Sequence, residues 1–153
     1  MRLDKSERRI LDALQRDGRI SNVQLAEQLG MSESPCLRKT RALEEAGVIA
    51  GYHATVNPRA VGLRVAAYVL VNLDQRSETQ TQAFFTALRD EPRIVECVAL
   101  TGTYDLLLKV ATRDIEDLAD LTMDGILSYD SVKDIASCVV LKEIKASSPL
   151  PVL

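Results

Sequence analysis

The chain has 153 residues, of which 46% are hydrophobic and 27% are charged, and its formal net charge is −3. This composition is typical of a globular protein with one domain or two small ones, and it argues against a disordered or fibrous chain. The sequence has no apolar run of transmembrane length, and its N-terminus is polar rather than signal-like. We therefore expect a cytoplasmic protein that has no membrane partner.

Charge is distributed unevenly along the chain. Residues 1–64 hold 11 basic and 8 acidic residues, a net charge of +3, whereas residues 65–153 hold 8 and 14, a net charge of −6. A mildly basic N-terminal part is compatible with a nucleic-acid partner even though the whole chain is anionic. Because this excess of positive charge is small, we expect tight binding to need more than one copy of the chain on the DNA.

Few residues suit metal or catalytic chemistry. Cys36, Cys97 and Cys138 are an odd number of cysteines without C-x-x-C spacing, and His53 is the single histidine. We expect small, buried free thiols in a reducing compartment rather than a disulfide or a metal site. The sequence also has no P-loop and no recognisable nucleophile with its base. We therefore predict no catalytic residues, no metal and no cofactor.

Three helices are predicted in the N-terminal part. The first runs from Asp4, which suits the N-cap, to Asp17. Two shorter helices follow within residues 21–46. The first of these begins with an S-x-x-Q capping box, and Gly30 supplies a left-handed turn before the second. The apolar positions expected to pack together are Ile10, Leu14, Leu25, Leu29 and Leu43.

The last of these helices has two chemically different faces. Ser32 can cap it, and Pro35 is tolerated because it lies in the first turn. On a helical wheel, small and apolar residues lie on one side and polar ones on the other. The inward set is Cys36, Thr40 and Leu43; the outward set is Ser34, Arg38, Arg41 and Glu45, with Lys39 on the flank. This pattern is that of a helix-turn-helix recognition helix, although a solvated basic face on an ordinary helical hairpin has the same pattern.

A change of composition follows this helical head. Residues 48–56 are β-prone and are predicted to form a strand or short ribbon, which would make the head winged-helix-like. The stretch 57–62 contains a turn signal around Asn57 and Pro58. We therefore predict a DNA-binding domain over 1–56, a hinge over 57–64 and a second domain over 65–153.

The second domain reads as βαββαβ. Its predicted strands are 65–73, 94–100, 105–111 and 132–145, and its predicted helices are 77–89 and a segment capped by Asp114 in which Ile115, Leu118, Leu121, Thr122 and Ile126 share a face. This order is that of a ferredoxin-like sandwich, so the fold class is α+β. Two helices cover one face of such a sheet. The other face is also apolar, and we expect it to mediate oligomerisation.

The sequence resembles the Lrp/AsnC, or feast/famine, family of transcription factors over nearly its whole length. The resemblance is carried by the runs GRIS, SPCLRK and GVIAGY in the head and ALTGTYDLLLKV in the second domain. The family's C-terminal domain is the RAM fold, which has the same βαββαβ order. The resemblance implies sequence-specific binding to double-stranded DNA by homodimers that commonly assemble into octamers.

The resemblance also assigns residues to two sites. The DNA-binding segment corresponds to Ser32, Ser34, Pro35, Arg38, Lys39 and Arg41. The effector loop, which binds a small amino acid between subunits in the family, corresponds to Thr101, Gly102, Thr103, Tyr104 and Asp105, with Ser137 on the last strand. Backbone amides of a glycine-containing turn can hold an α-carboxylate, and Asp105 can pair with an α-ammonium. A plain β-hairpin closed by its aspartate is the alternative.

Two departures from the family leave the effector open. Thr103 stands where relatives often carry an acidic residue, and Ser137 stands where they often carry threonine. The competing functions are a ligand-independent regulator, a nucleoid-like architectural DNA binder and an amino-acid sensor that does not bind DNA. An enzyme is a further class, because ferredoxin-like domains host catalysis elsewhere, but no catalytic constellation supports it here.

Overall fold

The computed structural model describes residues 2–74 and 77–153. The chain divides into two units, one formed by Met1–Thr55 together with Ile144–Leu153 and the other by Val56–Glu143. We call the first unit the head and the second the sheet unit. No helix in the described ranges is both long and apolar enough to span a bilayer.

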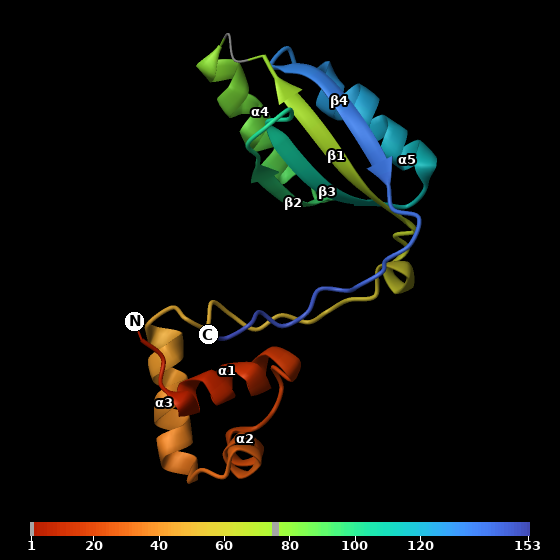
Figure 1. Ribbon diagram of the computed structural model, residues 1–153. Coiled ribbons are helices and arrows are strands. Elements are labelled where there is room, and N and C mark those ends of the chain that lie inside the picture. The colour runs from red at the N-terminus through yellow and green to blue at the C-terminus, as the bar shows by residue number, and fades with distance from the viewer. Residues whose placement is uncertain (1, 75–76) are drawn as a thin grey trace. The chain divides into compact units, whose positions relative to one another are not determined.

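The head is a three-helix unit (Figure 1), formed by α1 (Lys5–Arg16), α2 (Asn22–Leu29) and α3 (Glu33–Glu45). Two of the three predicted helix starts carry a reciprocal capping box: Asp4 with Glu7 on α1, and Ser21 with Gln24 on α2. These side chains satisfy amides that have no partner inside the helix. Ser32 occupies the N-cap of α3, but its side chain makes no capping hydrogen bond.

Glycine sets the turn between α2 and α3. Gly30 has a φ of 63°, in the left-handed region that residues with a Cβ avoid, and its N–H donates to carbonyls of the last turn of α2. The turn lets α3 pack back over α1 and α2. The buried residues of the head core are Ile10, Leu11, Ala13, Leu25, Ala26, Leu29, Cys36 and Leu43.

The predicted strand or ribbon at 48–56 is wrong, because this segment is irregular. A strand is stable only when its backbone groups pair with a neighbouring strand, and the described part of the head provides none. Its first residues instead bond to the end of α3: the N–H groups of Val48 and Ile49 both donate to the Leu43 carbonyl, at 2.9 and 3.1 Å. After this segment, Asn57 caps the short 3₁₀ helix η1 (Pro58–Val61), which ends at Gly62.

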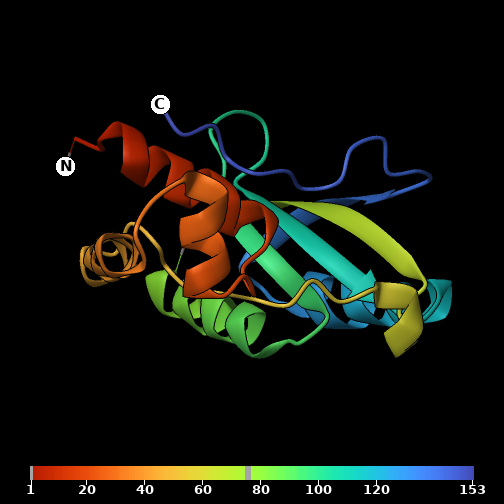
Figure 2. The ribbon, with the colours of Figure 1, turned by 90° about the horizontal axis from the view of Figure 1, so that it is seen from below.

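The sheet unit has the predicted βαββαβ order. Its elements are β1 (Val65–Leu73), α4 (Glu78–Asp90), β2 (Ile94–Ala99), β3 (Leu106–Thr112), α5 (Ile115–Ala119), the wider turn η2 (Asp120–Gly125), the 3₁₀ turn η3 (Ile126–Ser128) and β4 (Val132–Val139). The antiparallel sheet has the order β2-β3-β1-β4. Figure 2 shows α4 and α5 on the same side of it.

Alternation along β1 separates the core from the open face of the sheet. Ala67, Val69 and Val71 are fully buried under the helices and pack with Phe84 and Leu108. The residues between them point the other way. With their register partners, they form what we call the open face: Ala66, Tyr68, Leu70, Glu96, Val98, Leu107, Lys109, Ala111, Ala136 and Cys138.

Several predictions for this unit are wrong in detail. Strand β4 ends at Val139 rather than at residue 145. Val139 pairs with Ala67, the Val140 N–H makes one further bond to the Ala66 carbonyl at 2.8 Å, and β1, which begins at Val65, offers no partner beyond residue 141. Ile115 is 53% exposed at the first helical position, although the residues expected to share its face are buried. Cys36 is buried as predicted, but Cys97 and Cys138 are exposed, since β2 and β4 are edge strands.

The compact sheet unit ends earlier than the predicted second domain, 65–153. Residues Ile144–Leu153 cluster with the head and not with the sheet unit. The side chain of Gln15 bonds both backbone groups of Leu150, and Val152 packs against the head core. Contacts between residues so far apart in sequence left no local signal from which they could be predicted.

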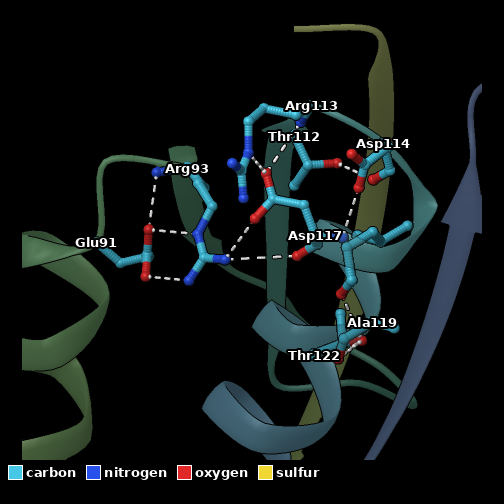
Figure 3. Close-up of polar contacts among 9 residues, drawn as sticks. Glu91, Arg93, Thr112, Arg113, Asp114, Asp117, Ala119 and Thr122 are labelled. Carbon is cyan, nitrogen blue, oxygen red and sulfur yellow. Dashed lines mark hydrogen bonds and ion pairs between the residues drawn. The ribbon is translucent and has the colours of Figure 1, made fainter.

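A cluster of charged residues joins β2 to α5 (Figure 3). Asp117, only 5% exposed, accepts hydrogen bonds from Arg93 Nη1 at 2.8 Å and from the backbone N–H and Nε of Arg113 at 3.0 and 3.1 Å. Arg93 also bonds both carboxylate oxygens of Glu91 at 2.8 Å. Hydrogen bonds from Arg113, and then from Arg93, hold the pKa of Asp117 well below its usual range. We call these four residues the charge clamp.

Candidate DNA-binding and effector-binding sites

The outward face of α3 carries two arginines that have no partner among the described residues of the head. Ser34, Arg38 and Arg41 are all exposed, as the helical wheel predicts, and they line a shallow surface hollow. Among the residues that the structure describes, no hydrogen bond or ion pair engages either guanidinium. Two unpaired guanidinium groups and a hydroxyl near the start of a helix can contact base edges or phosphates in a major groove.

Lys39 differs from these arginines because it is engaged within the head. Its ammonium bonds the carboxylate of Asp4 and lies 3.8 Å from Glu7 Oε1. The hydrogen bond with Asp4 raises the pKa of Lys39 and lowers that of Asp4. Lys39 therefore ties α3 to the start of α1, and a DNA phosphate would have to compete with two carboxylates for it.

The remaining predicted DNA-binding residues lie at the start of α3. Ser32 is exposed at the N-cap, and Pro35 is half-buried in the first turn. The sequence analysis missed Asn22, whose side-chain amide donates to the Glu33 carbonyl at 3.3 Å and so joins the starts of α2 and α3. It also missed Leu37, which is 37% exposed beside Arg38. Neither residue has a local sequence pattern that identifies it.

The 101–105 loop joins β2 to β3, and its aspartate anchors it to β1. Asp105 Oδ2 accepts from the N–H of Leu73 at 2.8 Å, and the N–H of Asp105 donates to the Val71 carbonyl at 3.0 Å. Thr101, Gly102 and Thr103 are exposed, whereas Tyr104 and Asp105 are half-buried. Gly102 has a φ of 118°, and no atom lies within 4 Å of where a Cβ would stand. The aspartate thus has a structural role, but only one of its oxygens has a bond in the described structure.

A single protomer does not bring Ser137 to this loop. Ser137 pairs with Val69, whose side chain is in the core, so it points to the helix-covered side of the sheet. Asp105 directly precedes Leu106, the partner of Val71. Two strand spacings and three residues along β4 place Ser137 roughly 14 Å from Asp105. Ser137 and the loop could therefore meet at one ligand only through different subunits.

The structure instead places a polar pair beside the loop. Asn72 Nδ2 donates to Asp134 Oδ1 at 2.9 Å across β1 and β4, and both residues belong to the open side of the sheet. Asn72 is the next residue along β1 after Val71, which binds the N–H of Asp105. The sequence analysis did not single out either residue. The available signal in the sequence was Asn72 itself, an amide within the otherwise apolar run VAAYVLVNL.

Family models match both units of the chain. A model described as the Lrp/AsnC ligand binding domain matches residues 66–150, and one described as winged helix-turn-helix DNA-binding matches residues 3–50. The first alone spans more than half of the chain. The ligand-binding model covers the sheet unit with the 101–105 loop, and the DNA-binding model covers α1 to α3.

Full-length relatives agree with these models. The leucine-responsive regulatory protein of Escherichia coli is 36% identical over 148 residues, which cover 97% of this chain and 90% of that protein. A transcriptional regulator from Neisseria meningitidis, solved as a complex with L-Met, is 37% identical with a TM-score of 0.94, and the match covers 98% and 97% of the two chains. An AsnC family transcriptional regulator from Agrobacterium tumefaciens is 29% identical with a TM-score of 0.89, over 97% of each chain.

The matches decide the fold and separate a regulator from an enzyme. They confirm the predicted α+β fold with a helix-turn-helix head and a RAM-type domain, and they identify a regulator rather than an enzyme. The two matched domains also combine DNA binding and ligand binding in one chain. The protein belongs to the Lrp/AsnC family of DNA-binding transcriptional regulators.

Proposed function

We propose that α3 enters the DNA major groove and that Ser34, Arg38 and Arg41 make its base and phosphate contacts. The proposal is carried by one observation: both guanidinium groups are exposed on the same helix face, with no partner in the described part of the chain. An arginine of this kind can bond guanine bidentately or hold a phosphate. Ser32 and Pro35 lie at the start of α3 and would therefore face the same DNA major groove. We assign Lys39 a weaker phosphate contact, because it is already paired with Asp4.

We propose further that a small amino acid binds at the 101–105 loop and modulates this DNA binding. Asp105 keeps one carboxylate oxygen without a bond in the described structure, which can pair with an α-ammonium. The exposed backbone around Gly102 can hold an α-carboxylate. The similar Neisseria protein was solved as a complex with L-Met, which supports an amino acid as the chemical class.

The proposed site is completed at a subunit interface. The open face of the sheet is mostly apolar and no described segment of the sheet unit covers it, which favours a dimer formed through it. Ser137 points to the helix-covered side of the sheet, so a partner on the open face does not supply it, and it would reach the loop of another subunit only through a contact between dimers. We propose that such dimers assemble further, to an octamer, and that the protein acts in the cytoplasm.

Thermal unfolding with each of the twenty amino acids tests the effector proposal. A ligand at about 100 times its Kd stabilises the folded state by roughly 2.7 kcal/mol, which raises the melting temperature measurably. The informative variant is Asp105→Asn, because an amide oxygen still accepts from Leu73 N–H while the negative charge is removed. The matched control is Asp124→Asn, at an exposed position on η2.

We expect one or a few amino acids to raise the melting temperature of the wild type and the Asp124→Asn variant but not that of Asp105→Asn. The absence of a shift with all twenty amino acids would refute the effector proposal and favour a ligand-independent regulator. A shift that persists in Asp105→Asn would remove the loop from the site.

A titration of DNA binding against salt separates a specific regulator from an architectural binder. We expect an operator to be bound about 10³-fold or more tightly than random DNA at the same salt concentration. Equal affinities for the two DNAs would favour the nucleoid-like alternative, because phosphate contacts alone do not distinguish sequences.

A further inference from the structure

The last five residues of the chain are seated on the head. The C-terminus lies beside the helical head in Figure 1, and residues 144–153 belong to the same unit as α1, α2 and α3. Val152 is half-buried against the head core, although Leu150 and Leu153 are 75% and 90% exposed. The side chain of Val152 therefore contacts the head, whereas those of Leu150 and Leu153 remain largely in solvent. We call residues 149–153 the tail.

The backbone of the tail is bound by one glutamine side chain. Gln15 Oε1 accepts from the N–H of Leu150 at 2.7 Å, and Gln15 Nε2 donates to the Leu150 carbonyl at 3.1 Å. Leu150 stands between Pro149 and Pro151, which have no N–H. It is therefore the only residue of this Pro-Leu-Pro segment that can donate to the glutamine. A primary amide suits this position because it offers an acceptor and a donor side by side.

The seat of the tail is a groove with two walls. One wall is the α1 surface at Leu11, Leu14 and Gln15, and the other is the segment 48–52. The second wall is fixed by the bonds of Val48 and Ile49 to the end of α3, and by Tyr52, whose hydroxyl donates to Glu44 Oε1 at 2.9 Å. The groove is therefore built from the head alone. Prolines on either side of Leu150 hold the tail extended before it docks, which reduces the entropy lost on docking.

Docking of the tail changes how the head is connected to the rest of the chain. The chain passes between the two units once at Thr55–Val56 and a second time at Glu143–Ile144. Without the tail contact, the first connection alone would join the head to the sheet unit. A second connection reduces the range of head positions that the irregular segment 48–56 and the following turn allow.

We propose that the tail is a strap: by docking in the groove beside Gln15, it tethers the head a second time and so restricts the distance between DNA half-sites that two heads can occupy together. A restricted pair of heads has a high effective concentration at one spacing and a low one at others. The strap selects spacing and leaves the contact of each head with its own half-site unchanged. Its effect on DNA rests on the proposed role of α3, whereas its docking does not.

The first test measures docking without DNA. Hydrogen exchange followed by mass spectrometry is compared for the wild type, Gln15→Ala, Leu150→Pro and a chain that ends at Ser148. The Leu150→Pro variant removes the donated N–H, replaces a mostly exposed leucine side chain and keeps the extended backbone. The matched control is Gln82→Ala, at an exposed position of α4 in the other unit. We expect at least fivefold faster exchange over 48–52 and along the C-terminal half of α1 in the three strap variants. Unchanged exchange would overturn the strap.

The second test measures the same proteins on DNA. Affinities are measured for a single half-site and for paired half-sites whose separation varies in steps of one base pair. We expect the wild type and Gln82→Ala to prefer one separation, and the strap variants to lose at least fivefold of that preference while binding the single half-site normally. A preference that survives the loss of the tail would overturn the strap. Failure of the wild type to bind any of these DNAs would instead refute the role of α3, and the exchange measurements would still decide whether the tail docks.

Discussion

Two groups of arginines in this protein have opposite surroundings. Arg38 and Arg41 on α3 are exposed and have no partner in the described chain, whereas Arg93 and Arg113 in the charge clamp share the carboxylate of Asp117. Arginine side chains always carry their charge, so the residue type does not distinguish the groups. The difference lies in which carboxylates the fold brings near them. An unpaired guanidinium is available to a phosphate or a base, and a paired one stabilises the protein itself.

The largest effect is expected from breaking the clamp at its centre. Asp117→Ala leaves Arg93 and Arg113 without their shared partner and removes three accepted hydrogen bonds in a nearly buried place. We expect the melting temperature of the sheet unit to fall by about 10 °C or more. Circular dichroism on heating measures it. Asp124→Ala, at an exposed position, should lower it by less than about 2 °C. Equal effects of the two variants would show that the clamp does not contribute to stability.

The next largest effect is expected on DNA affinity rather than on the stability of the fold. Arg38→Ala should weaken operator binding by about 1–3 kcal/mol if Arg38 reads a base, and should relax specificity at that position. If it holds only a phosphate, binding should weaken equally for all sequences, with a salt slope smaller by about 1. Fluorescence anisotropy at several salt concentrations measures both quantities. Arg89→Ala, an exposed arginine on α4, is the control and should change affinity by less than about twofold. Operator binding that is unaltered in Arg38→Ala would remove this residue from the site.

A smaller and pH-dependent effect follows from the lowered pKa of Asp117. Because its folded-state pKa lies below the value in the unfolded chain, its contribution to stability is complete above about pH 5 and is lost as the pH falls further. We expect the denaturant midpoint of the sheet unit to fall between about pH 5 and pH 2. The same titration of Asp117→Asn should be flatter, since the amide does not ionise. Parallel curves for the two proteins would contradict this assignment.

The smallest effect on DNA affinity is expected for Lys39, which shares features of both groups of arginines. Lys39 belongs to the recognition helix but is paired with Asp4 and Glu7. Lys39→Met should therefore reduce DNA affinity less than Arg38→Ala, by about twofold to threefold, and should lower the melting temperature of the head by only a few degrees. The same anisotropy and unfolding experiments measure both. A loss of affinity as large as that of Arg38→Ala would place Lys39 with the unpaired arginines.

The candidate sites were predictable to different degrees. The helical wheel correctly turned Ser34, Arg38 and Arg41 outward, because a single helix fixes its own faces. It did not reveal that Lys39 bonds to a carboxylate 35 positions away. At the effector loop, the sequence identified Asp105, but only the sheet register showed that Leu73 occupies one of its oxygens. The same register separates Ser137 from the loop within one chain.

The sequence alone determined the features that depend on neighbouring residues. The capping boxes of Asp4 with Glu7 and of Ser21 with Gln24 span three positions, and the left-handed turn at Gly30 needs only the absence of a Cβ. Strand β1 has the bounds expected from its apolar run, and the βαββαβ order follows from alternating periodicities. In all of these features, the responsible physical interactions act over a few residues.

The tertiary structure alone decided the features that depend on distant partners. Residues 48–56 are β-prone but pair with no neighbouring strand in the described chain, and β4 ends at Val139 because the register leaves β1 no partner for residues beyond 141. The clamp joins Arg93 to Asp117 across 24 positions, and Gln15 holds Leu150 across 135. Residues this far apart meet only after the whole chain has folded, and no pattern within a short stretch of sequence specifies which of them will be partners.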